Sequence, residues 1–243
     1  MYTLEPAKFA EYNLSNLRKF VNFWSAYYKY SVKKIGSEEE IDYFHEINIG
    51  NDLTKSNVVN LLRWKDPKYL TNTIFSGPNE GASNDRVDRV LSKLSVINSF
   101  RRSEINPEEF KKITSQFFPN GVIWEIFVFH ISKPLEYPIA DQHVFRSYSY
   151  HKNCNYPVSW KKYDGYRKYF SEMIEMLYAS ESDLNRLENQ KQLDDALMVY
   201  GKFLKQYEVE HKASNVALGS STAMYFKSSS PPPIRRIAPR TPF

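Results

Sequence analysis

The sequence predicts an all-α protein, and three observations carry this prediction. Apolar residues recur at three- and four-residue spacing along most of the chain instead of alternating. Glycine is scarce, with 8 residues in 243, about half of what an average usage of about 7% would give. Several segments also begin at a helix-capping residue and end at Pro or Gly. Turn-dense β architectures are therefore disfavoured.

The N-terminal part contains three expected helices. The first covers residues 14–35 and carries an apolar face formed by Leu17, Phe20, Val21, Trp24, Tyr27 and Tyr28. The acidic residues of 37–40 suit the first turn of a second helix toward His45, because carboxylates are favourable at a helix N-terminus. A third helix opens at Thr54 and is stopped by Asp66-Pro67.

A turn-rich stretch from Ser76 to Ser83 follows, so a possible internal boundary lies near 76–84. The next helix has a stripe of Val87, Val90, Leu91, Leu94 and Ile97. Asn106-Pro107 then starts another helix, with a capping residue, Pro at the first helical position and two acids in the first turn. That helix ends within residues 118–121.

The segment 122–131 is apolar on nearly every side, which predicts the most buried helix of the core. Pro134 and Pro138 force an irregular link, after which Asp141 begins a helix toward residue 150. Two longer helices are expected over residues 163–178 and 184–210. We expect one helical domain over 1–212, followed by a basic, Ser- and Pro-rich, disordered tail over 213–243.

Charge is concentrated in that tail. The chain has 33 Lys and Arg against 28 Asp and Glu, a formal charge of +5. Five basic residues and no acid lie in 211–243, so residues 1–210 hold 28 of each sign. The high isoelectric point therefore reports the tail, and it is not evidence that the helical part has a basic DNA-binding surface.

Several function classes are excluded. No glycine-rich phosphate-loop or dinucleotide motif is present. The single cysteine, Cys154, excludes an internal disulfide framework, a cysteine zinc cluster and an iron–sulfur cluster, and it fits a reducing compartment. We find no signal segment and no apolar run near 18 residues, so we expect a cytoplasmic protein without a membrane partner.

The most informative stretch is Phe118 to Arg146. Asp141 is well placed as an N-cap, because its carboxylate can accept hydrogen bonds from the amides of His143 or Val144. Those amides and the helix N-terminus favour the ionised form. An ionised carboxylate held in a groove can stabilise a developing positive charge in a transition state. A plain N-cap that contributes about 1 kcal/mol to stability is the alternative.

The order of turn, buried helix, loop and then Asp141-Gln-His-Val-Phe-Arg146 resembles the helix-hairpin-helix base-excision DNA glycosylases, in an 8-oxoguanine glycosylase-like branch. Gly121 precedes Asp141 by 20 residues, which matches the family spacing between hairpin and catalytic Asp. The segment from Leu193 to Gly201 also resembles the helix that closes the family domain. The resemblance implies duplex DNA as partner, Asp141 as catalytic residue and a hairpin at Pro119, Asn120, Gly121 and Val122 that binds the DNA backbone.

The chain also departs from the family pattern. The hairpin Lys of the bifunctional members falls near Ile123 or Trp124 and is apolar here, so the resemblance implies a monofunctional enzyme without a Schiff-base Lys at that position. No cofactor is implied. Lys111 and Lys112 lie on the helix that leads into the hairpin, where a phosphate contact is geometrically sensible.

Several residues are candidates for a pocket that holds a flipped base. Trp64, Trp124 or Trp160 could supply stacking, although core packing is the more common role. Glu125 and His130 interrupt the buried helix and are either satisfied core groups or pocket residues. His143 completes the candidate base pocket, although we expect it to face structure rather than substrate. A metal nuclease is disfavoured, because His130, Asp141 and His143 do not share one element.

The sequence therefore supports one leading hypothesis and one alternative. The leading hypothesis is a monofunctional DNA glycosylase that hydrolyses the N-glycosidic bond of a modified or mispaired base flipped from duplex DNA. The alternative is a catalytically inactive helical module that binds nucleic acid or protein. The two hypotheses differ in the role of Asp141, which is catalytic in the first and not in the second.

Overall fold

A computed structural model describes residues 14–28, 32–35, 39–66, 85–118, 121–154, 157–178 and 186–218. It is mostly helical, as the sequence predicts. The chain divides into two compact units, 1–206 and 207–243. In the second unit only the helical backbone to Leu218 is described. The predicted boundary near 76–84 and the predicted tail beyond residue 218 lie outside the described residues.

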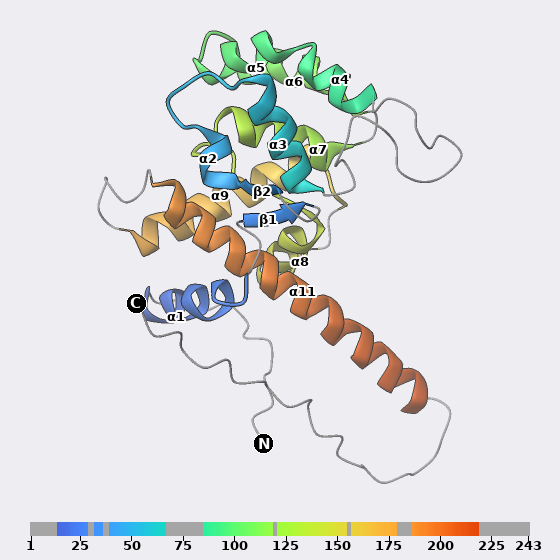
Figure 1. Cartoon of the computed structure of the whole chain (residues 1–243). Coiled ribbons are helices and arrows are strands. Elements are labelled where there is room, and N and C mark those ends of the chain that lie inside the picture. The colour runs from blue at the N-terminus through green and yellow to red at the C-terminus, as the bar shows by residue number, and fades with distance from the viewer. Residues whose placement is uncertain are drawn as a thin grey trace. The chain divides into compact units, whose positions relative to one another are not determined.

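Figure 1 labels the elements in chain order. The described helices and strands are α1 (Leu14–Ser25), β1 (Val32–Ile35), β2 (Glu39–Asp42), α2 (Tyr43–Ile47), α3 (Lys55–Lys65), α4 (Asp85–Leu91), α5 (Leu94–Arg101), α6 (Pro107–Thr114), α7 (Val122–Ser132), α8 (Gln142–His151), α9 (Trp160–Leu177) and α11 (Leu187–Leu218).

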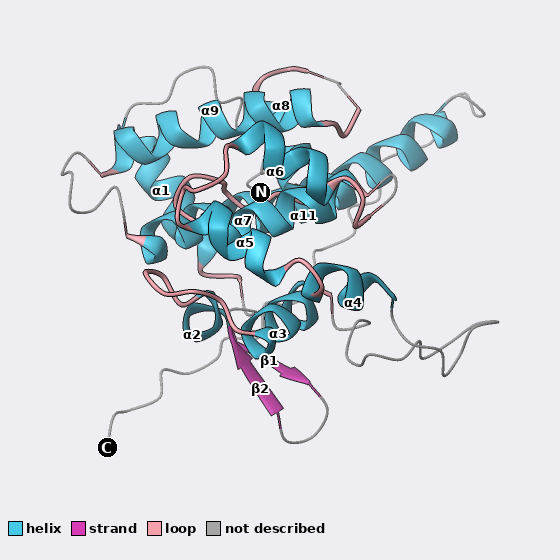
Figure 2. Ribbon diagram, turned by 90° about the horizontal axis from the view of Figure 1, so that it is seen from above, coloured by secondary structure: helices cyan, strands magenta, loops and turns pink. Residues whose placement is uncertain are grey.

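The N-terminal prediction was wrong in two respects: the first helix is shorter than expected, and acidic residues 39–40 lie in a strand and not in the first turn of a helix, since α2 begins only at Tyr43. Helix α1 ends at Ser25, not at residue 35, and residues 32–35 pair with 39–42 as antiparallel strands. In that register Lys34 lies opposite Glu40. The physical reason is local: β-branched residues and Gly36 are poor in helices, and the former are favoured in strands. Figure 2 shows this hairpin at one edge of the helices, next to α2 and α3.

The predicted helix starts are confirmed where a capping residue marks them. Thr54 and Asn57 form a capping box at α3. Asn106 accepts a hydrogen bond from the Glu109 amide, with Pro107 at the first helical position of α6. The stripe predicted as one helix over 87–97 forms two, α4 and α5.

Helix α7 lies at the centre of the core, as its all-round apolar pattern predicts. Residues 125–132 are all buried. The ring of Phe129 contacts those of Phe100, Phe110, Tyr137 and Trp160, at centroid distances of 4.8 to 5.2 Å. These contacts join α5, α6 and α9 to one helix, so α7 and the loop that follows it are held in a fixed position.

Arg101, the last residue of α5, joins two helix ends. Its guanidinium donates to the carbonyl oxygens of Ile131 in α7 and Ile47 in α2, both at 2.8 Å. The last carbonyls of a helix have no partner within the helix. The fork of Arg101 therefore completes the C-terminal ends of two helices that are distant in sequence.

Helices α8 and α11 touch at backbone distance. A Cβ added to Gly201 would lie 1.9 Å from the carbonyl oxygen of His143 and 2.9 Å from Oγ of Ser147. Helix α11 runs through this glycine and continues to Leu218, past the end that the sequence predicts at residue 210. The lack of a side chain at Gly201 thus allows α8 and α11 to pack closely. This contact fixes α8 beside α11, the helix that also carries Lys191 and Asp194.

Candidate functional site

Asp141 is the N-cap of α8, as the sequence predicts. Its Oδ1 accepts hydrogen bonds from the amides of His143, at 2.7 Å, and Val144, at 2.9 Å. The side chain is half-buried. Among the described residues none donates to Oδ2. The N-cap hydrogen bonds therefore fix Oδ1, whereas Oδ2 can interact with a bound molecule.

Charged and phenolic groups from three other parts of the chain interact with Asp141. Lys65, at the end of α3, and Asp194, in α11, are both close enough to interact with it electrostatically. Tyr28, which follows α1, is a third such group. Burial lowers the pKa of Lys65, with the two carboxylates opposing that shift, and it raises the pKa of Tyr28.

Lys191 of α11 is the buried cation of this network. Its ammonium is paired with Asp194, at 3.3 Å, and with Asp195. Three rings enclose it, with centroids 4.1 Å away at Tyr28, 5.5 Å at Trp64 and 5.7 Å at Tyr43. Burial raises the pKa of Asp194, and it raises that of Asp195 to about 7.

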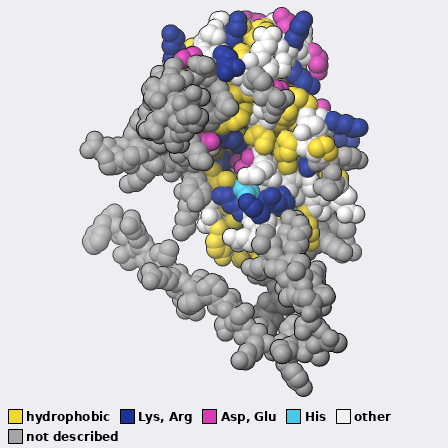
Figure 3. All heavy atoms as spheres, turned by 90° about the vertical axis from the view of Figure 1, so that its right-hand side faces the viewer, with side chains coloured by type: hydrophobic (Ala, Val, Ile, Leu, Met, Phe, Trp, Pro, Cys, Tyr) yellow, Lys and Arg dark blue, Asp and Glu magenta, His cyan; other side chains and the backbone are white. Residues whose placement is uncertain are grey.

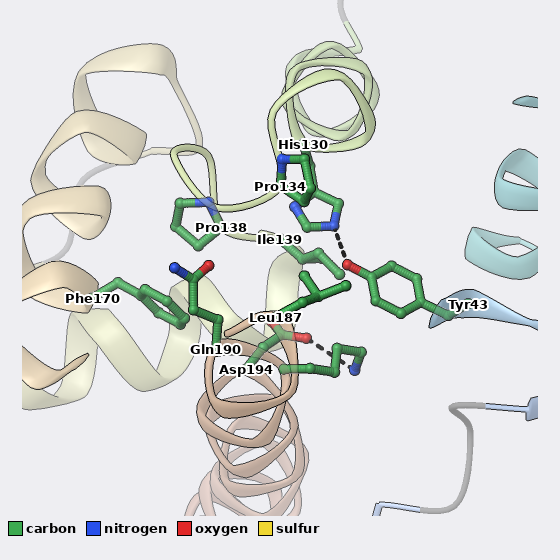
Figure 4. Close-up of a pocket in the computed structure, with 10 residues that line it drawn as sticks. Tyr43, His130, Pro134, Pro138, Ile139, Phe170, Leu187, Gln190 and Asp194 are labelled. Carbon is green, nitrogen blue, oxygen red and sulfur yellow. Dashed lines mark hydrogen bonds and ion pairs between the residues drawn. The ribbon is translucent and has the colours of Figure 1, made fainter. Parts of the chain in front are cut away.

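A cavity of about 10 Å³ lies between α7 and α11, which is room for one water molecule. Figure 4 shows His130 and Tyr43 on one side of it and Asp194 on the other. Oδ1 of Asp194 is buried and has no hydrogen-bond partner among the described residues. A water in this cavity would give that oxygen the donor it lacks.

The two polar residues predicted within the buried helix are both held by specific partners. His130 is bonded at Nδ1 to the Tyr137 carbonyl, at 2.7 Å, and at Nε2 to the Tyr43 hydroxyl, at 2.6 Å. A carbonyl only accepts, so Nδ1 carries the proton and Nε2 accepts. Burial lowers the pKa of His130 to about 3. Glu125 accepts a hydrogen bond from Trp160, at 2.8 Å.

The aromatic candidates lie within packed clusters. Trp64 is buried against Tyr43 and Lys191. Trp124 is half-buried and stacks on Phe118 at 5.6 Å. Of the three tryptophans, Trp64 is the one placed beside the charged network around Asp141, through Lys191.

The predicted DNA contacts lie at the start of α7 and on α6. Pro119 and Asn120 are outside the described residues. Gly121 caps α7 and comes so close to Phe118 that an added Cβ would lie 2.7 Å from the Phe118 Cβ, and Val122 begins the helix. Lys112 is exposed. Lys111 lies over the Trp160 ring, 4.6 Å from its centroid.

Cationic residues also lie near Asp141 at the start of α8. His143 is half-buried in the first turn of α8, and Arg146, Lys202 and Lys205 all act on it electrostatically. Figure 3 shows a face on which Lys and Arg side chains gather around a histidine, with acidic side chains nearby. Burial lowers the pKa of His143, and Asp141 opposes that shift.

Sequence reasoning missed most of these neighbours. The spacing of Lys191 to Asp194 and Asp195 places the three on one helix face, and that signal was available. So was the three-residue spacing of His143 and Arg146. No linear pattern brings Lys65, from the end of α3, to Asp141, because tertiary packing alone makes that approach.

Other site types are not found in the described part of the chain. It contains no group of three or more His, Cys, Asp or Glu side chains arranged to hold a metal ion. None of its helices is both long enough and apolar enough to cross a membrane. No family model, curated protein or solved structure matches the chain.

The geometry defines what the site can do chemically. A carboxylate with one fixed and one open oxygen can stabilise a cation that forms beside it. The cationic cluster next to it can hold an anion. A substrate that carries a phosphate near a centre that becomes positive would use both features.

Proposed function

We propose that the protein is a monofunctional DNA glycosylase with Asp141 as its catalytic carboxylate. The observation that carries the proposal is the half-buried Asp141, whose Oδ1 is fixed by two amides while no described donor occupies Oδ2. Its position 20 residues after Gly121, in a motif that resembles the helix-hairpin-helix glycosylases, gives that carboxylate its proposed role.

The proposed reaction is hydrolysis of the bond between a base and C1′ of its deoxyribose. As the bond breaks, its electron pair leaves with the base and positive charge develops on the sugar. The open oxygen of Asp141 stabilises that charge. Water then adds its oxygen to C1′ and one of its protons ends on the base, so the products are a free base and an abasic site.

The neighbours of Asp141 support this role. Its carboxylate interacts with the Lys65 ammonium, while Lys191 is engaged by the two other carboxylates, Asp194 and Asp195. Lys191 and Asp194 are buried, and electrostatic interactions between buried groups are stronger than in water. Close packing of α8 against Gly201 keeps Asp141 in a fixed position, which transition-state stabilisation requires.

The test is base release from a panel of duplexes, each with one modified or mispaired base. Wild-type protein should produce abasic sites in at least one duplex. Asp141→Asn should lower the single-turnover rate by about 10²–10³-fold and leave duplex affinity within about threefold. The amide oxygen of Asn still caps α8, so the fold is retained. If no lesion yields abasic sites with the wild type, the enzyme proposal fails.

Lys65 allows a second test, of the monofunctional part of the proposal. An amine near C1′ could instead form an imine with the abasic aldehyde, and borohydride would trap that complex covalently. We expect no trapped complex with wild-type protein, because Lys65 acts as an electrostatic neighbour of Asp141. A complex that forms with the wild type and disappears in Lys65→Met would make the enzyme bifunctional.

One observation favours a second candidate, an inactive helical module that binds nucleic acid or protein. The two bonds to Oδ1 are those of an ordinary N-cap, which contributes to stability without any chemistry. If Asp141 is only a cap, Asp141→Asn leaves binding unchanged and no lesion duplex loses its base with either protein. The base-release panel therefore separates the two candidates.

A further inference from the structure

The cationic cluster beside Asp141 consists of His143 and Arg146 on α8 and Lys202 and Lys205 on α11. Arg146 bonds to His143 and to the Gly201 carbonyl, where α8 packs directly on α11, and Lys202 and Lys205 follow on α11 close enough to act on His143 electrostatically. Besides burial, Arg146, Lys202 and Lys205 lower the pKa of His143, and Asp141 raises it. Three cationic side chains are thus gathered near this carboxylate, although residues 1–210 are neutral in sum.

Arg146 is held with part of its guanidinium still available. Its Nη1 donates to the Gly201 carbonyl, at 3.2 Å, and to Nδ1 of His143, at 3.1 Å. No other described residue accepts from it. The remaining N–H groups are therefore fixed in direction and unused, which suits two-point recognition of a phosphate.

The same contact sets the tautomer of His143. A guanidinium can only donate, so Nδ1 of His143 accepts and the proton of the neutral ring lies on Nε2. Burial, which lowers the pKa of His143, favours that neutral ring. No described residue bonds to Nε2, so this N–H is a second donor of fixed direction beside the guanidinium.

The two lysines extend the cluster along α11. They are three residues apart, which places them on the same face and about 4.5 Å apart along the axis. Arg146 follows Asp141 by five residues, about 7.5 Å along α8. Cations that are distributed over two adjacent helices suit the repeating phosphates of a polyanion.

We propose that His143, Arg146, Lys202 and Lys205 bind backbone phosphates of duplex DNA immediately beside the nucleotide that faces Asp141. The proposal rests on the proposed function for the identity of the partner. It moves the main backbone contact away from α6, where Lys111 lies over the Trp160 ring. It also explains how a chain with a neutral helical part can bind a polyanion.

The experiment measures binding of the full chain to a fluorescein-labelled 20-base-pair duplex with one abasic site, by anisotropy at several salt concentrations. The variant is Lys202→Gln/Lys205→Gln. The matched control, Lys161→Gln/Lys168→Gln, makes the same charge change at exposed lysines of α9. Thermal unfolding of each variant confirms that it is folded.

If each lysine contacts one phosphate, the slope of log affinity against log salt falls in magnitude by about 2. At 0.1 M salt that corresponds to about 60-fold weaker binding, since each contact is worth about 8-fold. The control should stay within about twofold of the wild type. Arg146→Lys, which keeps the charge and loses the fork, should weaken binding with little change of slope.

Three results overturn the proposal: wild-type affinity and slope in the double variant, equal losses in variant and control, or no DNA binding by the wild type. The proposed function fails separately. If the double variant loses affinity as stated but no lesion duplex releases a base with wild-type protein, the phosphate site stands and the glycosylase proposal does not.

Discussion

His130 and Asp194 lie on opposite sides of the same small cavity, and both are buried, yet their hydrogen bonding differs (Figure 4). On the α7 side both ring nitrogens of His130 have partners within the fold. On the α11 side Oδ1 of Asp194 has none among the described residues, and the network continues electrostatically to Asp141. Two buried polar groups at one cavity can thus differ in how completely the fold satisfies their hydrogen bonding.

The largest expected effect tests the α11 side. Lys191→Met leaves Asp194 and Asp195 buried without their cation, so it should lower the free energy of unfolding by about 3–5 kcal/mol. Urea unfolding at pH 8 measures this. Lys191→Met/Asp194→Asn should recover part of the loss, and Lys19→Met, at an exposed position of α1, should cost almost nothing. A loss below 1 kcal/mol for Lys191→Met would show that this side carries little stability.

The next effect connects the two helices of the site. Gly201→Ala places a methyl group in the backbone of α8, so the helices must separate, at a cost of about 1–3 kcal/mol and with loss of base release. Gly165→Ala is the matched control, because the added Cβ there meets only the Tyr148 hydroxyl, the far end of a side chain. Thermal unfolding and base-release rates compare the two variants. Equal effects would contradict the close approach of α8 and α11.

The pH dependence of stability separates the two sides. Between pH 3 and 6.5 the unfolded chain binds a proton at His130 that the folded protein does not, so this group makes stability rise with pH. Asp195 has a pKa that is raised from 3.8 to about 7, so between these two pH values it binds a proton in the folded state but not in the unfolded chain. This group therefore makes stability fall with rising pH over that interval. Each slope is at most about 1.4 kcal/mol per pH unit.

Asp195→Asn removes the contribution that makes stability fall as the pH rises. Relative to wild type, the stability of this variant should therefore increase with pH between about 4 and 7. Urea unfolding at several pH values in that window gives the difference. Parallel curves for the two proteins would mean that Asp195 does not bind a proton in the folded state.

The smallest effect belongs to the α7 side. Trp160→Phe removes the donor to Glu125 and should cost about 1 kcal/mol of stability. The rate of base release should remain within about twofold of wild type, because the hydrogen bond between Trp160 and Glu125 does not involve Asp141. Denaturant unfolding and the base-release assay test both parts. A large loss of activity with unchanged stability would assign Glu125 to the base pocket.

Elements marked by local chemistry could be predicted from the sequence. The cap at Asp141 and the proline start of α6 depend on residues that are adjacent in the chain, and both are confirmed. The hairpin of β1 and β2 was missed because the first helix was extended over residues 32–35 and the acidic residues 37–40 were assigned to the start of the next helix. The neighbours of Asp141 could not be found, because Lys65 and Asp194 approach it only through packing between distant helices.

The fork of Arg101 has a consequence for the opening motions of the molecule. Since one guanidinium holds the final carbonyls of both α2 and α7, neither helix end can fray without giving up bonds that also hold the other. The two ends should therefore open as one cooperative unit, and their amide protons should exchange with solvent at a common rate. Cooperative opening of this kind would protect the end of the core helix from proteases.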